Sequence, residues 1–346
     1  MAISAAAAAS LPRRITLVSI SLPLWILLVV RILAFAGVQW DVAWHRSLGR
    51  ESFWSPPHLV IYASLGVVTL IALWVIAREG WVRGYGLVVL GGGIVYLSAP
   101  FDELWHRWYG LDVDIWSPPH LSGIAGGFII ALGSVYALAA ELGQLGRLDR
   151  TDSLRPLRHA RATDWTLIVF IALLLTSPLF AMGRYTIVAV SRDAVFYPIM
   201  AGLAVPAIAV ANLRATGYRW TATLTGFSYI ALMLLMAAIV MAMGLKPTSA
   251  PPLLLIPALA MDLFYAARRR TGGLVAAIIA GVVFSLVFYW TEYAWKLWLV
   301  GFTWRPDRML IGLPLSLLAG GLGGSLGYLL GNSFRDVSSA ESANPH

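Results

Sequence analysis

Long apolar runs separated by short polar loops make up most of this chain, and that pattern leaves few folds open to it. About 20 apolar residues in a row can cross a bilayer as a helix, in which each backbone N–H and C=O pairs within its own segment. Hydrophobic residues fill 59% of the 346 positions and charged residues 12%, which excludes an ordinary soluble domain. We predict an all-α polytopic membrane helix bundle with about ten transmembrane helices. The predicted spans are 15–40, 57–77, 84–105, 119–141, 164–183, 195–212, 221–244, 252–267, 273–299 and 309–331.

Basic residues gather in the loops on one side of the predicted spans, as they do on the cytoplasmic side of membrane proteins. Clusters such as Arg13–Arg14 and Arg268–Arg270 predict cytoplasmic N- and C-termini and a multi-pass protein of the cell inner or plasma membrane. They also explain the net charge of +8 as a topology signal, so the expected partner is the lipid bilayer and not nucleic acid. The first run is too long for a signal-peptide core, and no loop is large enough for a core of its own. We expect a single membrane domain over residues 1–346, in which residues 164–331 form additional transmembrane helices.

Two segments with the same polar residues interrupt this apolar pattern, 61 residues apart. In each segment an Asp and a His four positions apart end one predicted span, and the sequence Trp-Ser-Pro-Pro-His begins the next. The first segment contains Asp41, His45 and His58, and the second contains Asp102, His106 and His120. Together they hold four of the six histidines of the chain, so we interpret them as an internal repeat.

Helix geometry predicts that the polar residues of each segment converge. Side chains four positions apart on a helix project from one face, so Asp41 and His45 are expected about one turn apart. Serine is a common N-cap residue and proline fits the first helical turn, so Ser55 and the prolines after it place His58 at the start of the returning helix. We therefore predict a tandem helical-hairpin repeat in the first four helices, a repeated four-helix metal-binding unit over residues 15–141. Its sites are expected on the periplasmic or extracellular face.

The donor groups limit which metal such a site would hold. The chain has no cysteine, so the ligands must be imidazole and carboxylate groups. Two histidines and one carboxylate suit copper, zinc or non-haem iron, and copper stands highest in the divalent affinity order. An alternative makes these residues helix caps and partners of Arg46, Arg50 and Arg107. Capping needs no imidazole at four matching positions, so a pair of metal sites is the favoured interpretation, while the sequence leaves open whether they form one dinuclear centre.

Several charged residues lie inside the predicted spans, where charge is costly and often functional. Arg31 and Asp262 fit either a proton route or a buried ion pair. Glu292 and Lys296 also fit helix-end charges that reach the interface. Small residues such as Gly320–Gly324 indicate close helix packing in the later spans.

The spacing of the repeated residues resembles that of a known family. The pattern Asp, three residues, His, twelve residues, His at 41–58 resembles the copper site in the membrane-embedded C subunit of particulate methane and ammonia monooxygenases. The pattern Asp, three residues, His, thirteen residues, His at 102–120 resembles the neighbouring second copper site of that subunit, in which the family has asparagine where this chain has Asp102. The resemblance covers residues 41–120.

The resemblance implies a copper-binding relative of the copper membrane monooxygenases, which oxidise methane, ammonia or short hydrocarbons with dioxygen. Those enzymes contain two further subunits, one with a periplasmic cupredoxin domain that this chain lacks, and the family suggests a trimeric assembly. We therefore expect an oxygenase or a subunit of one, acting on a small apolar substrate or ammonia, with partner subunits or further copies of the chain. In that role the Asp and His side chains are ligands and not general acids. The alternative is a membrane protein that binds or delivers copper or zinc without catalysis.

Overall fold

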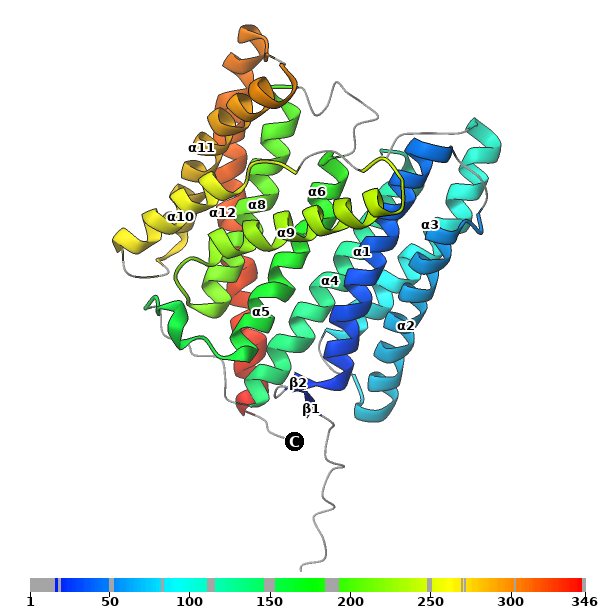
Figure 1. Ribbon diagram of the computed structural model, residues 1–346. Helices are drawn as coiled ribbons and strands as arrows, with labels where there is room; N and C mark the ends of the chain where they lie inside the picture. Colours follow the sequence, from blue (N-terminus) through cyan, green and yellow to red (C-terminus); the bar gives the residue numbers. More distant parts are fainter. Residues whose placement is uncertain are drawn as a thin grey trace, which may run out of the picture.

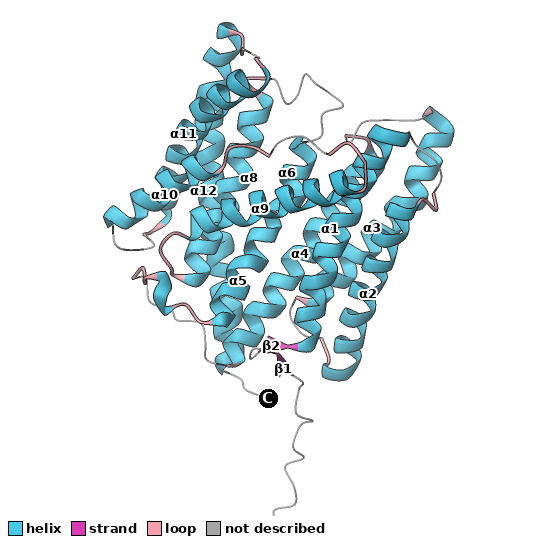
Figure 2. Ribbon diagram, in the orientation of Figure 1, coloured by secondary structure: helices cyan, strands magenta, loops and turns pink. Residues whose placement is uncertain are grey.

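The computed structural model is a bundle of α-helices with a short β-hairpin where the described chain begins (Figure 1; Figure 2). The described residues are 16–17, 20–49, 53–81, 84–110, 116–145, 153–183, 193–247, 251–268, 270, 272–301 and 303–343. Within these ranges, nine helices are long and apolar enough to cross a membrane. The prediction of an all-α polytopic helix bundle is confirmed.

The first part of the chain forms two helical hairpins. Strand β1 (Thr16–Leu17) pairs antiparallel with β2 (Ile20–Ser21), which leads directly into the first helix. The four helices are α1 (Leu22–Leu48), α2 (Pro56–Glu79), α3 (Tyr85–Tyr109) and α4 (Pro118–Gln144). Proline in the first turn begins α1, α2 and α4, at positions where its missing N–H would have no helical partner. Of the nine spans, α2 and α3 are the least buried within the chain.

The second part of the chain contains one broken span and one short helix. Its helices are α5 (Ala162–Ala172), α6 (Thr176–Gly183), α8 (Phe196–Thr216), α9 (Thr221–Ala242), α10 (Leu255–Arg268), α11 (Leu274–Val300) and α12 (Pro306–Ala343). A 3-10 turn, η1 (Leu157–His159), precedes α5, and a second, η2 (Leu173–Leu175), separates α5 from α6 inside the span predicted at 164–183. Pro178 accompanies this break, because it has no N–H to donate to the carbonyl of Leu174 one turn earlier.

One of the ten predicted spans is too short to cross a bilayer as a helix. The run predicted at 252–267 forms α10, which has 14 residues and a length of about 21 Å. Pro251 and Pro252 explain its late start, since proline lacks a backbone N–H and disfavours helical geometry in the residue before it. Residues 251–254 have no regular secondary structure and lead into α10.

Both ends of the described chain lie at the same end of the bundle (Figure 1). The backbone N–H of Ser21 donates to the carboxylate of Glu141, near the end of α4 (2.5 Å). A side chain added at Gly143 would meet the backbone of Ser338, near the end of α12. Two ends on the same side require an even number of membrane crossings, and there are nine long spans among the described residues. We infer that α10, together with residues 251–254, provides the further crossing. The cytoplasmic location of that end stays a prediction.

Glycines on two sides of α12 allow close contact with its two neighbours. Gly320 and Gly324 face α11, where an added Cβ would clash with the backbone of Gly281 or Ala277. The glycines that face α8 in the same way are Gly323, Gly327 and Gly331. Such small residues four positions apart let membrane helices approach closely, so the small residues noted at 320–324 pack α12 against both α8 and α11.

Two buried charges on α11 form an ion pair. Glu292 is fully buried and accepts hydrogen bonds from the Tyr197 hydroxyl (3.1 Å) and the backbone N–H of Leu253 (2.9 Å). The Lys296 ammonium lies 3.4 Å from the same carboxylate and is itself buried. The sequence analysis left open whether Glu292 and Lys296 form a buried ion pair or are helix-end charges that reach the interface. The structure supports the buried ion pair.

Asp262 of α10 caps the first turn of α9. Its carboxylate accepts hydrogen bonds from the backbone N–H groups of Ala222 (3.3 Å) and Thr223 (2.7 Å), and from the Thr223 hydroxyl (2.7 Å). These N–H groups have no partner within the helix, and a negative charge is favourable at a helix N-terminus. Asp262 therefore has a structural role that accounts for its charge.

We expect Gly281→Ala to lower the melting temperature and Gly93→Ala, the matched control, to leave it unchanged or raise it. A Cβ at position 281 would clash with the Gly320 carbonyl oxygen, and such overpacking costs about 1–3 kcal/mol. At Gly93, which also lies within a helix, no atom is within 4 Å of an added Cβ. Thermal unfolding of both purified variants in one detergent measures the difference, and equal melting temperatures would contradict the close crossing of α11 and α12.

Candidate metal centres

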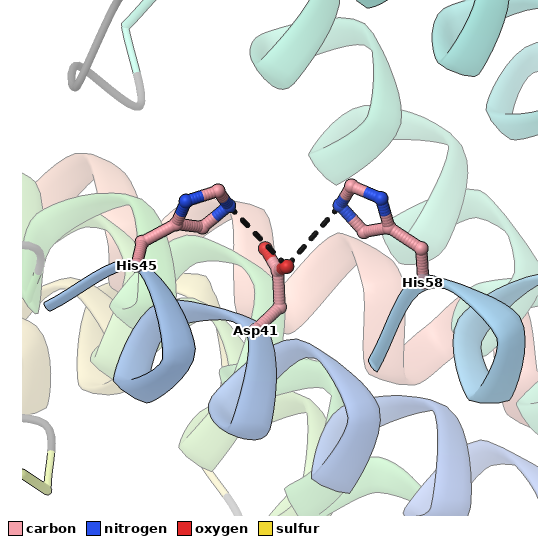
Figure 3. A group of neighbouring side chains, drawn as sticks. All are labelled: Asp41, His45 and His58. Carbon is pink, nitrogen blue, oxygen red and sulfur yellow. Dashed lines mark ion pairs between the residues drawn. The ribbon is translucent and has the colours of Figure 1, made fainter. Parts of the chain in front are cut away.

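Asp41 lies between two imidazole rings at the end of the first helical hairpin (Figure 3). Asp41 and His45 stand in the last turns of α1, and His58 is the third residue of α2. The Oδ1 atom of Asp41 is 3.4 Å from Nε2 of His45 and 3.1 Å from Nε2 of His58. The structure thus brings together the three residues that helix periodicity and the Ser-Pro-Pro-His sequence grouped.

The second hairpin carries a group of nearly the same geometry. The Oδ1 atom of Asp102, on α3, is 3.2 Å from Nε2 of His106 and 3.3 Å from Nε2 of His120, on α4. The two imidazole ring centroids are 6.3 Å apart here and 6.4 Å apart in the first group. The two repeated sequence segments therefore place the same donor atoms in matching positions.

The serine before each Pro-Pro pair stands at the helix N-cap but does not cap the helix. Ser55 and Ser117 have the extended backbone expected there, and neither side chain accepts a capping hydrogen bond. A proline such as Pro119 at the second helical position removes one of the N–H groups that an N-cap side chain normally accepts from. The Ser117 hydroxyl lies instead 2.9 Å from Nδ1 of His120, so it orients that imidazole.

Backbone carbonyls determine which ring nitrogen carries the hydrogen in two of these histidines. Nδ1 of His58 lies 3.1 Å from the carbonyl oxygen of Phe53, and Nδ1 of His106 lies 3.2 Å from that of Gly110. A carbonyl only accepts, so each Nδ1 donates, and Nε2 of the neutral ring then carries a lone pair. In both groups this lone pair faces a carboxylate oxygen. A cation between them, either a metal ion or an added proton, removes the resulting repulsion.

The spacing of the donor atoms suits a transition-metal ion. Nitrogen and oxygen ligands lie about 2.0–2.2 Å from such an ion, so ligands at angles of 90–110° are about 2.9–3.4 Å apart. The four Asp–His distances, from 3.1 to 3.4 Å, fall in this range, and all donor atoms of one group lie within 4.8 Å of one another. Oδ1 of Asp41 and Oδ1 of Asp102 are buried and accept no hydrogen bond from the described residues. Each group can therefore hold one ion, with room for a further ligand.

The nearby arginines do not neutralise these aspartates. Arg46 donates to a backbone carbonyl beyond the end of α9 (2.7 Å), and Arg107 donates to Glu103 (3.2 Å). Arg50 lies outside the described residues. No arginine in the described part of the chain forms an ion pair with either aspartate, so neither Arg46 nor Arg107 supplies the pairing that the alternative account requires.

Both groups border one partly open cavity of about 260 Å³, which is lined by both hairpins and by α6. Asp41 and His58 line it from the first group, and Asp102 and His120 line it from the second. Apolar side chains of α1 to α4 and α6 form most of its wall. Arg31 also lines it, from a position in α1 ten residues before Asp41. The six residues thus form two separate groups of three that share one cavity.

Three residues that support the first group or its repeat were missed by the sequence analysis. Phe53 and Gly110 contribute only backbone carbonyls, for which the sequence has no signal. Tyr62 packs its ring 5.8 Å from the ring of His58 and also lines the cavity. Its position one helical turn after His58 was a signal that could have identified it.

The chain matches no protein-family model, and no curated protein or solved structure proved similar to it. The geometry and donor chemistry of the two Asp/His/His groups are therefore the main indication of function. The resemblance over residues 41–120 contributes a hypothesis about the metal.

Proposed function

We propose that this membrane protein binds one transition-metal ion at each Asp/His/His group, with copper as the favoured metal, and works as an oxygenase or as a subunit of one. The observation that carries the proposal is the orientation of the imidazoles. Carbonyl partners hold Nδ1 of His58 and His106, so Nε2 of each ring points at a buried carboxylate oxygen at metal-ligand spacing. This combination of a ligand atom and an anchored second nitrogen is typical of metal-binding histidines.

Copper is proposed over zinc and non-haem iron for two reasons. Two imidazoles and one carboxylate are acceptable to all three metals, but copper binds nitrogen-rich sites most strongly of the divalent series. The resemblance to the monooxygenase C subunit at residues 41–120 also favours copper. Asp102, where that family has asparagine, adds a negative charge that stabilises a divalent ion more than a neutral amide does.

The surroundings of the two groups suit oxidation of a small apolar molecule. Bound copper would supply one-electron chemistry with dioxygen. The chain itself supplies the ligands that hold the ion, a position left for a further ligand, and a mostly apolar cavity beside both groups that accepts a hydrocarbon. Ammonia is the other substrate proposed from the resemblance. Electrons would come from a donor outside this chain, and partner subunits or a trimer of the chain are proposed on the same resemblance.

A second candidate function is binding or delivery of copper or zinc without catalysis. Its support is the partial exposure of the groups, since the side chains of Asp41 and His45 are 20% and 24% exposed and open to exchange with solvent. The shared cavity favours the oxygenase, because metal delivery has no use for an apolar chamber beside the ligands.

We expect Asp102→Ala to lower the copper content of the purified protein from about two ions per chain to about one, because the second site loses its only charged ligand and the first site keeps Asp41. The matched control is Glu103→Ala, which removes the neighbouring acid. Glu103 pairs with Arg107 and belongs to neither group, so this variant keeps both ions. Elemental analysis after a chelator wash measures the content. Unchanged copper in both Asp102→Ala and Asp41→Ala would remove the proposal.

The side of the membrane can be tested with single cysteines, because the chain has none of its own. Leu48 ends α1 on the side of the metal groups, and Trp81 follows the end of α2 on the opposite side of the bundle. Their exposed fractions are 57% and 79%. If the metal groups face the periplasm or cell exterior, a membrane-impermeant maleimide labels Leu48→Cys in intact cells and labels Trp81→Cys only after permeabilisation. The reverse pattern would place the groups on the cytoplasmic side.

Oxygen consumption distinguishes the two candidate functions. Copper-loaded protein given a reductant is expected to consume dioxygen faster when a short hydrocarbon or ammonia is added, and this increase should disappear in Asp41→Ala. Protein that keeps two copper ions per chain but shows no substrate-dependent consumption, alone or with added membrane partners, would support the binding protein instead.

A further inference from the structure

Arg31 is a cation in the middle of α1 whose contacts are all neutral. Its guanidinium donates to the carbonyl of Gly127 (2.9 Å), the carbonyl of Leu173 (3.1 Å) and the hydroxyl of Thr176 (2.9 Å). Its Nε atom is buried and has no partner among the described residues. No acidic side chain in the described part of the chain pairs with it. The positive charge of Arg31 therefore has no acidic partner among the described residues.

These contacts explain part of the role of Arg31. The carbonyl of Leu173 belongs to the turn η2, where the span of α5 and α6 breaks, and irregular backbone at membrane depth needs donors from elsewhere in the protein. A guanidinium has five N–H donors, and the three contacts occupy three of them. The second N–H of Nη1 and the whole charge remain for a ligand, whereas Nε is enclosed by protein atoms.

Arg31 also lines the cavity that the two Asp/His/His groups border. Ten residues separate Arg31 from Asp41 on α1, a distance of about 15 Å along the helix axis. The wall between them is apolar and includes Phe35, Leu65 and Ile124. The cavity therefore has a cation in one part, metal-ligating groups in another, and a hydrocarbon-like surface between them.

We propose that this cavity binds an organic monoanion with an apolar chain, a short-chain carboxylate, with its carboxylate on Arg31 and its chain directed toward the metal groups. A carboxylate brings one charge for one guanidinium and an acceptor oxygen for its unused Nη1 donor. A phosphate dianion would leave a second charge without a partner in an apolar cavity. The apolar wall accepts the chain, and the volume of about 260 Å³ suits a small ligand. Binding of the carboxylate to Arg31 needs no metal. Only the idea that the metal groups react with the apolar tail of the ligand rests on the proposed function.

The first experiment compares hexanoate with its neutral analogue hexanamide. Isothermal titration calorimetry of the full chain in phosphatidylcholine nanodiscs measures both affinities, and hexanoate is expected to bind about tenfold more tightly or better, because a charged hydrogen-bond pair replaces a neutral one. Acetate should bind more weakly than hexanoate, since it lacks the chain that covers the apolar wall. Equal affinities of hexanoate and hexanamide would overturn the proposal.

A matched pair of variants tests the assigned residue. Arg31→Gln keeps a hydrogen-bonding side chain without charge and is expected to weaken hexanoate binding about tenfold or more while leaving hexanamide binding nearly unchanged. The control is Arg78→Gln, which removes an exposed arginine that stacks on Trp74 at the far end of α2. Full hexanoate affinity in Arg31→Gln would overturn the proposal. If Arg31→Gln does not fold, the wild-type comparison of acid and amide decides by itself.

Removal of metal separates this proposal from the proposed function. Hexanoate binding that persists after treatment with a chelator assigns the carboxylate to Arg31. Hexanoate binding that disappears with the metal would show that the carboxylate coordinates the ion, and would overturn the proposal. Protein that binds hexanoate through Arg31 but never retains metal would contradict the proposed function and leave the carboxylate site standing.

Discussion

A polar group inside a bilayer must find its partner within the protein, because lipid offers neither donors nor acceptors. Most of this chain obeys that constraint through helices, and its later spans do so through the buried pair of Glu292 and the helix cap made by Asp262. Three buried atoms that have no hydrogen-bond partner among the described residues belong to side chains that line one cavity: Oδ1 of Asp41, Oδ1 of Asp102 and Nε of Arg31. A cation would stabilise the two aspartates, and an anion would stabilise the arginine. We therefore expect ligands in this cavity.

Much of the fold follows from the sequence, because hydropathy and helix periodicity act over short distances. Runs of apolar residues predicted the class and nine of the spans, and the four-residue spacing of Asp41 and His45 predicted a shared helix face. Two local features escaped that reasoning. The break at η2 inside 164–183 and the shortness of α10 depend on prolines whose effect varies with the neighbouring helices.

The relation between the two Asp/His/His groups could not be obtained from the sequence. It depends on how one hairpin leans against the other, which tertiary packing decides. The carbonyls that anchor His58 and His106 are backbone atoms common to every residue, so no residue type marked them. Arg31 was recognisable as an intramembrane charge, but its place in the wall of the shared cavity required coordinates.

Each Asp/His/His group belongs wholly to one hairpin, α1 with α2 or α3 with α4, whereas the cavity belongs to both. A change of tilt between the hairpins therefore alters the size and entrance of the chamber and leaves every donor distance intact. Retention of the proposed metal ions and admission of the proposed ligand would then be mechanically independent. The chain can vary the second without loosening the first.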